Sequence, residues 1–171
     1  MLDAYLDIET TGLSWLDSEI TVIGIYLVNS RENKMIQLLG DCINKDSLIE
    51  TLSGVQNIFT YNGKRFDMPF IQWSLGINLE TMAHHHDLMF DCWRCNLYGG
   101  FKAVEHQLNI PRELKGINGL DAVTLWRKYQ QEGDQKALTT LLKYNEEDVI
   151  NLKELRDKLR GYPVKNSENK W

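Results

Sequence analysis

The segment between residues 134 and 160 combines an apolar stripe with a single acid inside it, and this combination constrains the fold most. A helical period places four leucines on one face of the segment: Leu141, Leu152, Leu155 and Leu159. Tyr144 and Asp148 fall near the centre of the same stripe. Because a buried carboxylate needs a partner, Asp148 is expected to meet backbone donors, an arginine or a metal ion. The pattern predicts a long helix that is capped by Asp134 and packs against another layer.

A short early strand carries two more acids on one face. Leu6 and Ile8 alternate with Tyr5, Asp7 and Glu9, which predicts a strand. Side chains two apart on a strand point to the same face, about 6–7 Å from each other, so the two carboxylates project together. The pair either faces water from an edge strand or holds a cation between its like charges.

The remaining elements predict an α/β fold. Strands are expected over 20–28, 34–39, 55–61 and around 87–89, and helices after Asn44 and over 66–75, 101–108 and 120–131. The first three strands form an antiparallel unit, and strands and helices then alternate, which favours parallel strands joined by helices. The tryptophans are interpreted as core and packing residues. Trp73 is expected on the same buried helix face as Phe66 and Phe70, and Ile49 is expected to point inward.

Length, charge and cysteine content narrow the class of protein. The 171 residues suit a single domain, expected over residues 1–160 with a loose tail over 161–171. Lysine and arginine total 19 against 24 acidic residues, and the net charge of −5 argues against a broadly basic nucleic-acid clamp. No apolar run approaches the roughly 20 residues of a membrane span, and, because the first strand begins so early, no targeting segment is expected. Three cysteines, an odd number, favour a cytoplasmic setting.

A fourth acid follows the strand over 55–61. Asn62 stands in the turn after this strand, and Phe66 and Asp67 open the next helix. An aspartate in a first helical turn is favoured by the helix dipole alone. Asp67 also lies at a strand-to-helix junction, where sites form in open α/β sheets, so it is a candidate functional acid as well.

Three short motifs occur in order along the chain: Asp7-x-Glu9-Thr10, Asn62-x-x-x-Phe66-Asp67 and Tyr144-x-x-x-Asp148. Together they resemble the motifs of the DEDD 3′→5′ exonucleases, and the tyrosine four residues before the last acid matches the DEDDy, DnaQ-like subgroup. Residues 61–70 look closest to the proofreading exonuclease domains of family B polymerases, and residues 86–152 look more like stand-alone YprB-type exonuclease domains. The resemblance implies a ribonuclease-H-like α/β fold, with a five-stranded mixed sheet whose first three strands are antiparallel and with helices on both faces.

The same resemblance implies an activity and its cofactors. The substrate would be single-stranded DNA or RNA with a free 3′ end, hydrolysed to nucleoside 5′-monophosphates. Two divalent cations, Mg²⁺ or Mn²⁺, would be the only cofactors, because hard carboxylate oxygens suit these ions. Asp7 would bridge both ions, Glu9 and Asp148 would complete the ion that binds the attacking water, and Asp67 would hold the other. Tyr144 would orient the water through its hydroxyl.

Several residues are candidates for substrate binding. By resemblance, the backbone around Thr10 and the side chain of Leu13 hold the 3′-terminal nucleotide, while Asn62 and Phe66 line the next position. Lys102, at a helix start, is the preferred phosphate contact. Weaker candidates, which could equally be solvated surface charges, are Lys64, Arg65 and Arg94.

Two other functional classes stay open, and no protein partner is indicated. One is a nuclease-fold module that has lost catalysis and binds nucleic acid or protein, and the other is a structure-specific endonuclease. A zinc site formed by His84–His86 with Cys92 and Cys95 is disfavoured. Adjacent histidines on a strand alternate faces, and a lone C-x-x-C lacks a second pair of ligands.

Overall fold

A five-stranded mixed sheet forms the centre of the computed structural model, which describes residues 1–162. Its strands are β1 (Asp3–Thr10), β2 (Ile20–Val28), β3 (Asn33–Leu39), β4 (Asn57–Thr60) and β5 (His84–Asp87). Their spatial order is β3-β2-β1-β4-β5, with antiparallel β3-β2-β1 and parallel β1-β4-β5 pairing. The predicted sheet is therefore confirmed, and β1 lies at its centre. The expected tail over 161–171 falls almost entirely outside the described residues.

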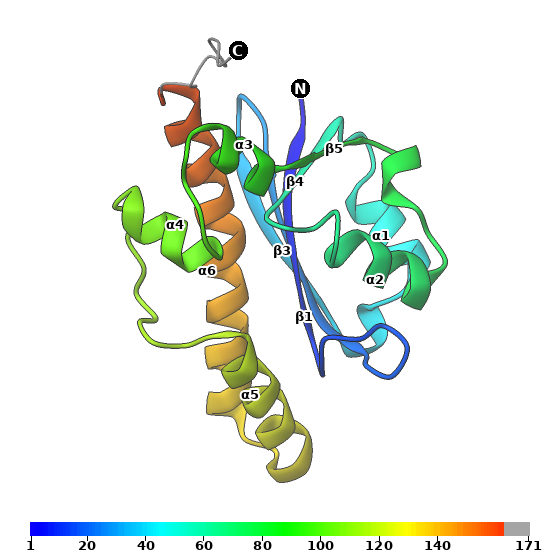
Figure 1. Cartoon of the computed structure of the whole chain (residues 1–171). Coiled ribbons are helices and arrows are strands. Elements are labelled where there is room, and N and C mark those ends of the chain that lie inside the picture. The colour runs from blue at the N-terminus through cyan, green and yellow to red at the C-terminus, as the bar shows by residue number, and fades with distance from the viewer. Residues whose placement is uncertain (163–171) are drawn as a thin grey trace.

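Helices cover both faces of this sheet, as predicted (Figure 1). They are α1 (Lys45–Thr51), α2 (Asp67–Leu75), α3 (Leu88–Arg94), α4 (Phe101–Gln107), α5 (Gly119–Glu132) and α6 (Gln135–Arg160), with short 3₁₀ turns η1 (Gly40–Cys42) and η2 (Leu79–Thr81). Helices α1 and α2 lie on one side of the sheet, and the long α6 runs along the other (Figure 1). None of the helices within residues 1–162 combines the length and apolar character that a membrane span needs.

The alternation of side chains along β1 decides which face carries its acids. Leu6 and Ile8 belong to the core that includes residues of α1 and α2. Tyr5, which points the other way, belongs to the core that includes residues of α6. Asp7 and Glu9 share the face of Tyr5 because side chains two apart on a strand lie on one side. The two acids therefore project toward α6.

A glycine allows α6 to approach the sheet closely. Gly24 lies opposite Asp7 in the pairing of β1 with β2, and a Cβ at this position would overlap the side-chain amide of Asn145 on α6. Asn145 is fully buried and donates from Nδ2 to the backbone oxygen of Asp7 at 3.3 Å. Its Oδ1 accepts a hydrogen bond from Gln37 of β3 at 3.0 Å. The contact holds α6 in register with β1 at the level of the acids.

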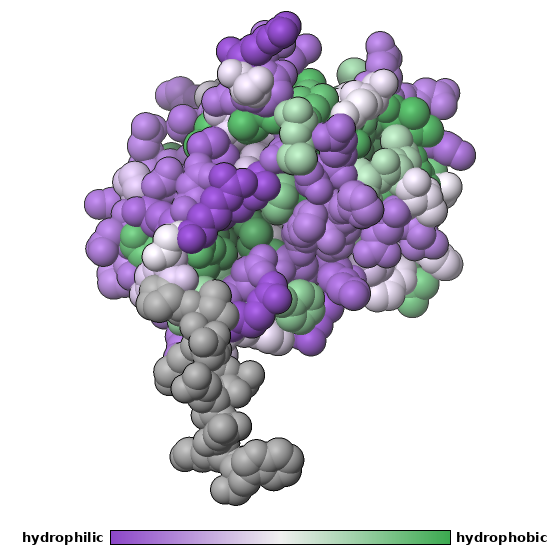
Figure 2. Space-filling view, turned by 90° about the horizontal axis from the view of Figure 1, so that it is seen from above, coloured by the Kyte–Doolittle hydropathy of each residue, from purple (hydrophilic) through white to green (hydrophobic). Residues whose placement is uncertain are grey.

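Some local expectations are wrong. Trp73 is 62% exposed and Ile49 is 37% exposed, so neither belongs to the core. The strand expected around residues 87–89 lies slightly earlier, at His84–Asp87, because Asp87 caps α3 by accepting from the backbone nitrogen of Met89. The end of the molecule that carries the last turn of α6 is largely hydrophilic, with small apolar areas between charged side chains (Figure 2).

Candidate active site

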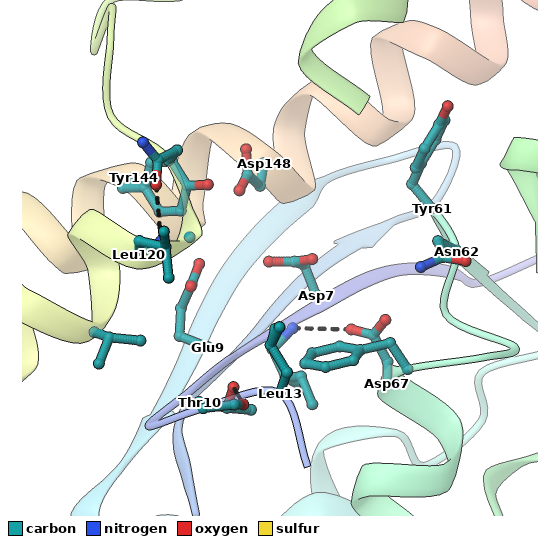
Figure 3. A pocket seen from close by; sticks show the side chains of 16 residues that line it. Asp7, Glu9, Thr10, Leu13, Tyr61, Asn62, Asp67, Leu120, Tyr144 and Asp148 are labelled. Atoms are coloured by element: carbon teal, nitrogen blue, oxygen red, sulfur yellow. Dashed lines mark hydrogen bonds between the residues drawn. The ribbon is translucent and has the colours of Figure 1, made fainter. Parts of the chain in front are cut away.

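Three carboxylates meet where α6 crosses β1. Asp7 and Glu9 from β1 and Asp148 from α6 each offer a ligand atom, and these atoms lie within 4.8 Å of one another. Glu9 and Asp148 are buried, with 6% and 7% of their surfaces exposed. Figure 3 shows the three side chains pointing toward one another across the gap between strand and helix. The alternative that Asp7 and Glu9 face water from an edge strand is wrong, because β1 is the central strand.

Asp67 lies beside the cluster of Asp7, Glu9 and Asp148, and it approaches β1 from the side of α2. It is the first residue of α2, is 3% exposed, and accepts a hydrogen bond from the backbone nitrogen of Ile8 at 3.0 Å. The parallel pairing of β1 with β4 ends at Tyr5 and Phe59, so the strands have separated at Ile8 and the Asp67 carboxylate fills the gap. Asp67 thus caps an open strand edge in addition to its place in a first helical turn.

Burial and mutual repulsion make this group of acids hard to ionise. Burial is the largest cause, and with the neighbouring carboxylates it raises the pKa values of Asp7 and Glu9 well above their usual range. Burial also raises the pKa of Asp67 to about 7, against hydrogen bonds that lower it. The pKa of Asp148 is raised to about 6 by burial, although Arg112 opposes the rise.

The donor set fits divalent cations. Glu9 Oε1 is buried and has no hydrogen-bond partner among the described residues, which is costly for a carboxylate oxygen unless a cation lies nearby. Carboxylate oxygens are the ligands that Mg²⁺ and Mn²⁺ prefer. Asp7, Glu9 and Asp148 could therefore hold a metal ion together, with Asp67 available beside them.

Tyr144 lies one turn before Asp148 on α6 and is held by a lysine. Its side chain is 5% exposed. Lys102 Nζ donates to the Tyr144 hydroxyl at 3.0 Å and lies 4.2 Å from the ring centroid. The same ammonium donates to the backbone oxygen of Ile117. Burial and the neighbouring acids raise the pKa of Tyr144, so its hydroxyl stays protonated at neutral pH and can donate or accept a hydrogen bond.

The acids open into a cavity of about 450 Å³. Nine of the predicted site residues line it: Asp7, Glu9, Thr10, Leu13, Asn62, Phe66, Asp67, Tyr144 and Asp148. Leu13 and Leu120 also line the cavity, from the β1–β2 loop and from α5, and their side chains are 81% and 74% exposed. The cavity therefore combines an acidic end with exposed apolar side chains (Figure 3).

Comparisons with known proteins decide the family. A family model described as the RNase_H superfamily matches residues 4–160. The chain belongs to the RNase_H superfamily. The ribonuclease-H-like fold predicted from the three motifs is thereby confirmed.

Solved structures agree with this RNase_H superfamily fold. NrnC of Brucella melitensis bound to pGG matches with a TM-score of 0.64 at 17% identity, over 94% of this chain and 72% of that chain. A second structure described as NrnC of Brucella melitensis has a TM-score of 0.61 at 18% identity, over the same shares of the two chains. A structure described as the apo form of a nuclease has a TM-score of 0.61 at 21% identity, again over 94% and 72%. No curated protein sequence matches the chain.

A second, smaller cavity of about 310 Å³ shares six lining residues with the first: Asp7, Tyr61, Asn118, Gly119, Tyr144 and Asp148. Lys102 lines this cavity, beside Phe101 at the start of α4. Two aromatic rings form part of its wall, because Tyr61 and Phe101 stack with their centroids 5.1 Å apart. The Tyr61 hydroxyl donates to the backbone oxygen of Gly99 at 2.7 Å, which fixes the ring.

Two charged residues at this RNase_H superfamily site escape sequence reasoning. Asp87 accepts from the backbone nitrogens of Asn62 and Lys64, at 2.7 and 3.1 Å, and so holds the turn in which Asn62 has a φ of 62°. Arg112 donates to Asp148, so the arginine partner considered for this acid is present in addition to the neighbouring carboxylates. For Asp87, the sequence feature that could have revealed it is an aspartate at the N-cap of a helix. Arg112 lies in an irregular loop, where no sequence pattern indicates its contact with Asp148.

The other charged and metal-ligating candidates lie apart from the acids. Lys64, Arg65 and Arg94 line neither of the two cavities, and Arg94 pairs with Asp91. Within residues 1–162, the acid cluster is the group of His, Cys, Asp or Glu close enough to hold a metal. Within the same residues, His84–His86 with Cys92 and Cys95 do not form such a group.

Proposed function

We propose that this protein is a metal-dependent 3′→5′ exonuclease that hydrolyses the terminal phosphodiester bond of single-stranded nucleic acid and releases nucleoside 5′-monophosphates. One observation carries the proposal: four acids, three of them buried and Asp7 half-buried, line a single cavity together with Tyr144, in the order of the DEDDy motifs. Membership of the RNase_H superfamily supports it. The structural likeness to a protein described as a nuclease is consistent with the fold that this activity needs.

The four acids divide the work of holding two divalent cations. Asp7 lies between the other acids and would contact both ions, Glu9 and Asp148 would complete one, and Asp67 would hold the other, directly or through water. When bound, two such ions polarise the phosphate and stabilise the attacking and leaving oxygens of an in-line displacement. The buried, unpartnered Glu9 Oε1 supports this assignment because it gives the ions an oxygen that no protein group satisfies.

Tyr144 would orient the attacking water. Its raised pKa makes proton abstraction by a phenolate unfavourable at neutral pH, so its hydroxyl acts as a positioning hydrogen-bond group. Lys102 supports the tyrosine from one side through the 3.0 Å hydrogen bond. Its ammonium also adds positive charge beside the scissile phosphate, which is the contact expected of Lys102 from the sequence.

The two cavities suit two successive nucleotides. The larger one would hold the 3′-terminal nucleotide, with its base against Leu13 and Leu120 and its sugar near Thr10. Asn62 and Phe66, which are expected at the next nucleotide position, line this larger cavity and not the smaller one. The smaller one would hold the nucleotide before it, whose base can stack on the Tyr61–Phe101 pair without reading sequence. The similar fold of NrnC, which is described with pGG bound, supports an oligonucleotide ligand.

The three cysteines are unpaired, which suits a reducing cytoplasm.

The test uses strands labelled at the 5′ end, in DNA and RNA form, each with either a free or a blocked 3′ end. Stepwise shortening of the free strands in Mg²⁺ or Mn²⁺, and none after chelation, is the expected result. Cutting of the blocked strands would instead indicate an endonuclease. Binding without cutting, under conditions in which both ions bind the protein, would indicate a module without catalysis.

A further inference from the structure

Arg112 lies in the loop between α4 and α5 and contacts Asp148 from outside both cavities. Its side chain is 10% exposed. Nη2 donates to Asp148 Oδ1 and to Glu105 Oε1, the latter at 2.8 Å, and Nε donates to Glu105 Oε2 at 3.0 Å. The guanidinium is thus held in a two-point contact with Glu105 and presents the same edge to Asp148.

Glu105 is fixed in turn. This residue of α4 is 3% exposed, and its Oε1 accepts from Asn151 Nδ2 at 2.7 Å. Asn151 belongs to α6, three residues beyond Asp148, and its amide also donates to the backbone oxygen of Pro111 at 3.2 Å. A closed hydrogen-bond network therefore joins three parts of the chain: α4, α6 and the loop that precedes α5. This network fixes the orientation in which the Arg112 guanidinium contacts Asp148.

The contact serves the position of Asp148 more than its charge. Arg112 lines neither cavity, so it has no route to the substrate. Its positive charge is shared with Glu105, at 2.8 Å from Nη2, and with Glu147, at 4.0 Å from Nη1, so Arg112 and these two glutamates together add no net positive charge beside Asp148. What the Arg112–Glu105 pair does supply is a fixed donor for Oδ1, which sets the rotation of the carboxylate relative to Asp7 and Glu9.

We propose that Arg112, locked by Glu105, is a positioning residue that aims the Asp148 carboxylate at the metal ions. The inference rests on the proposed function, because it assumes that Asp148 is a metal ligand. Hydrogen-bond partners of metal ligands commonly fix ligand orientation, and their loss lowers metal affinity by about 10- to 100-fold.

The deciding variant removes the pair without changing net charge. Glu105→Gln combined with Arg112→Gln leaves two amides that can still hydrogen-bond to each other. A matched control, Asp3→Asn combined with Arg156→Gln, removes another Arg–Asp contact between β1 and α6, one whose Nη1–Oδ2 distance is 2.6 Å. Mn²⁺ binding to each folded protein is measured by calorimetry without nucleic acid, and folding is checked by thermal unfolding.

The expected result is Mn²⁺ affinity about 10- to 100-fold lower in the Glu105/Arg112 variant and unchanged within about twofold in the control. Equal affinities in all three proteins, or equal losses in both variants, would overturn the role of Arg112. If wild-type protein bound no Mn²⁺, the proposed function would fail first and the inference with it.

Single substitutions distinguish positioning from simple charge and cover the case in which the double variant does not fold. Arg112→Gln removes a positive charge, so a purely electrostatic role predicts tighter Mn²⁺ binding, whereas a positioning role predicts weaker binding. Arg112→Lys keeps the charge but not the two-point contact, so a several-fold loss is expected. Tighter binding by Arg112→Gln, or full affinity in Arg112→Lys, would contradict the proposal.

Discussion

Helix α6 and strand β1 meet along a seam that has an arginine–aspartate contact at each end, and the two ends differ in how their charges are balanced. At one end, Arg156 donates from Nη1 to Asp3 at 2.6 Å and to the Tyr5 hydroxyl at 2.8 Å. Its guanidinium carbon lies 3.8 Å from the centroid of the Phe59 ring. Each charged group there has a partner from the opposite element.

At the other end, the positive charge of Arg112 is too small to balance the negative charges of the neighbouring acids. Arg112 contacts Asp148 but is shared with Glu105, and within residues 1–162 neither Asp7 nor Glu9 forms an ion pair. Burial raises the pKa at both ends. At the first end the hydrogen bonds from Arg156 and Asn57, with the charge of Arg156, outweigh burial and lower the pKa of Asp3, whereas at the second end the pKa of Asp7 is raised. One end is therefore a structural clasp, and the other is an acid cluster that needs cations.

The largest effect is expected from Asp7→Asn. Loss of the ligand shared by both ions should lower nuclease activity by at least about a thousandfold, roughly 4 kcal/mol of transition-state stabilisation. The metal-free protein should be as stable as wild type or more so, because one charge leaves a crowded cluster. Thermal unfolding in chelator and single-turnover kinetics measure the two quantities, and a large loss of stability would mean that Asp7 is structural.

Tyr144→Phe should have the next largest effect. It removes one hydroxyl from the acidic end of the seam and leaves the ring in place, so activity should fall by about 10- to 100-fold, the value of one hydrogen bond to a charged group. Mn²⁺ affinity should not change. Calorimetry and turnover rates on the same preparation check this, and a parallel loss of Mn²⁺ affinity would show that Tyr144 acts through the acids instead.

The acidic end should also respond to pH. The pKa values of Asp67 and Asp148, about 7 and about 6, exceed the usual value of about 3.9, so the metal-free folded protein holds protons that the unfolded chain releases. The contribution of Asp67 and Asp148 to its stability should be greatest below about pH 4 and decline as pH rises toward 7. Mn²⁺ affinity should rise at least about tenfold from pH 5.5 to 7.5, because the ligands must lose protons. Calorimetry across this range tests it, and Asp67→Asn should flatten the profile.

A substitution in the structural clasp, formed by Asp3 and Arg156, should affect stability and leave activity almost unchanged. Asp3→Asn should lower the free energy of unfolding by about 1–3 kcal/mol, since it weakens a partly buried hydrogen bond to a charged group. Turnover at a temperature where the protein is folded should stay within about twofold of wild type. Denaturant unfolding gives the first value. A strong loss of turnover in folded Asp3→Asn would erase the distinction between the two ends.

The acidic end is more predictable from sequence than the elements around it. Asp148 stands out because it interrupts a leucine stripe on α6, and Asp7 and Glu9 because a strand period places them together. These two patterns depend only on residues within one helix or one strand, so they do not depend on the conformation of the loops. Asp67 follows from its place after a strand, since sites form at such junctions.

What the sequence does not yield depends on contacts between distant segments. Helix α3 has seven residues, too few for a clear period, and its cap Asp87 also ends β5. Arg112 contacts Asp148 only because α4 and the loop before α5 fold back onto α6. Trp73 shows the reverse error, because its helical spacing from Phe70 predicts a buried side chain and yet it is 62% exposed.

The most direct test compares wild-type protein, Asp7→Asn and Asp3→Asn on one single strand labelled at its 5′ end, in Mn²⁺. Wild type and Asp3→Asn should shorten the strand from its 3′ end and release nucleoside 5′-monophosphates, while folded Asp7→Asn should leave it intact. Degradation by Asp7→Asn at the wild-type rate, or no degradation by wild type with both ions bound, would contradict the account.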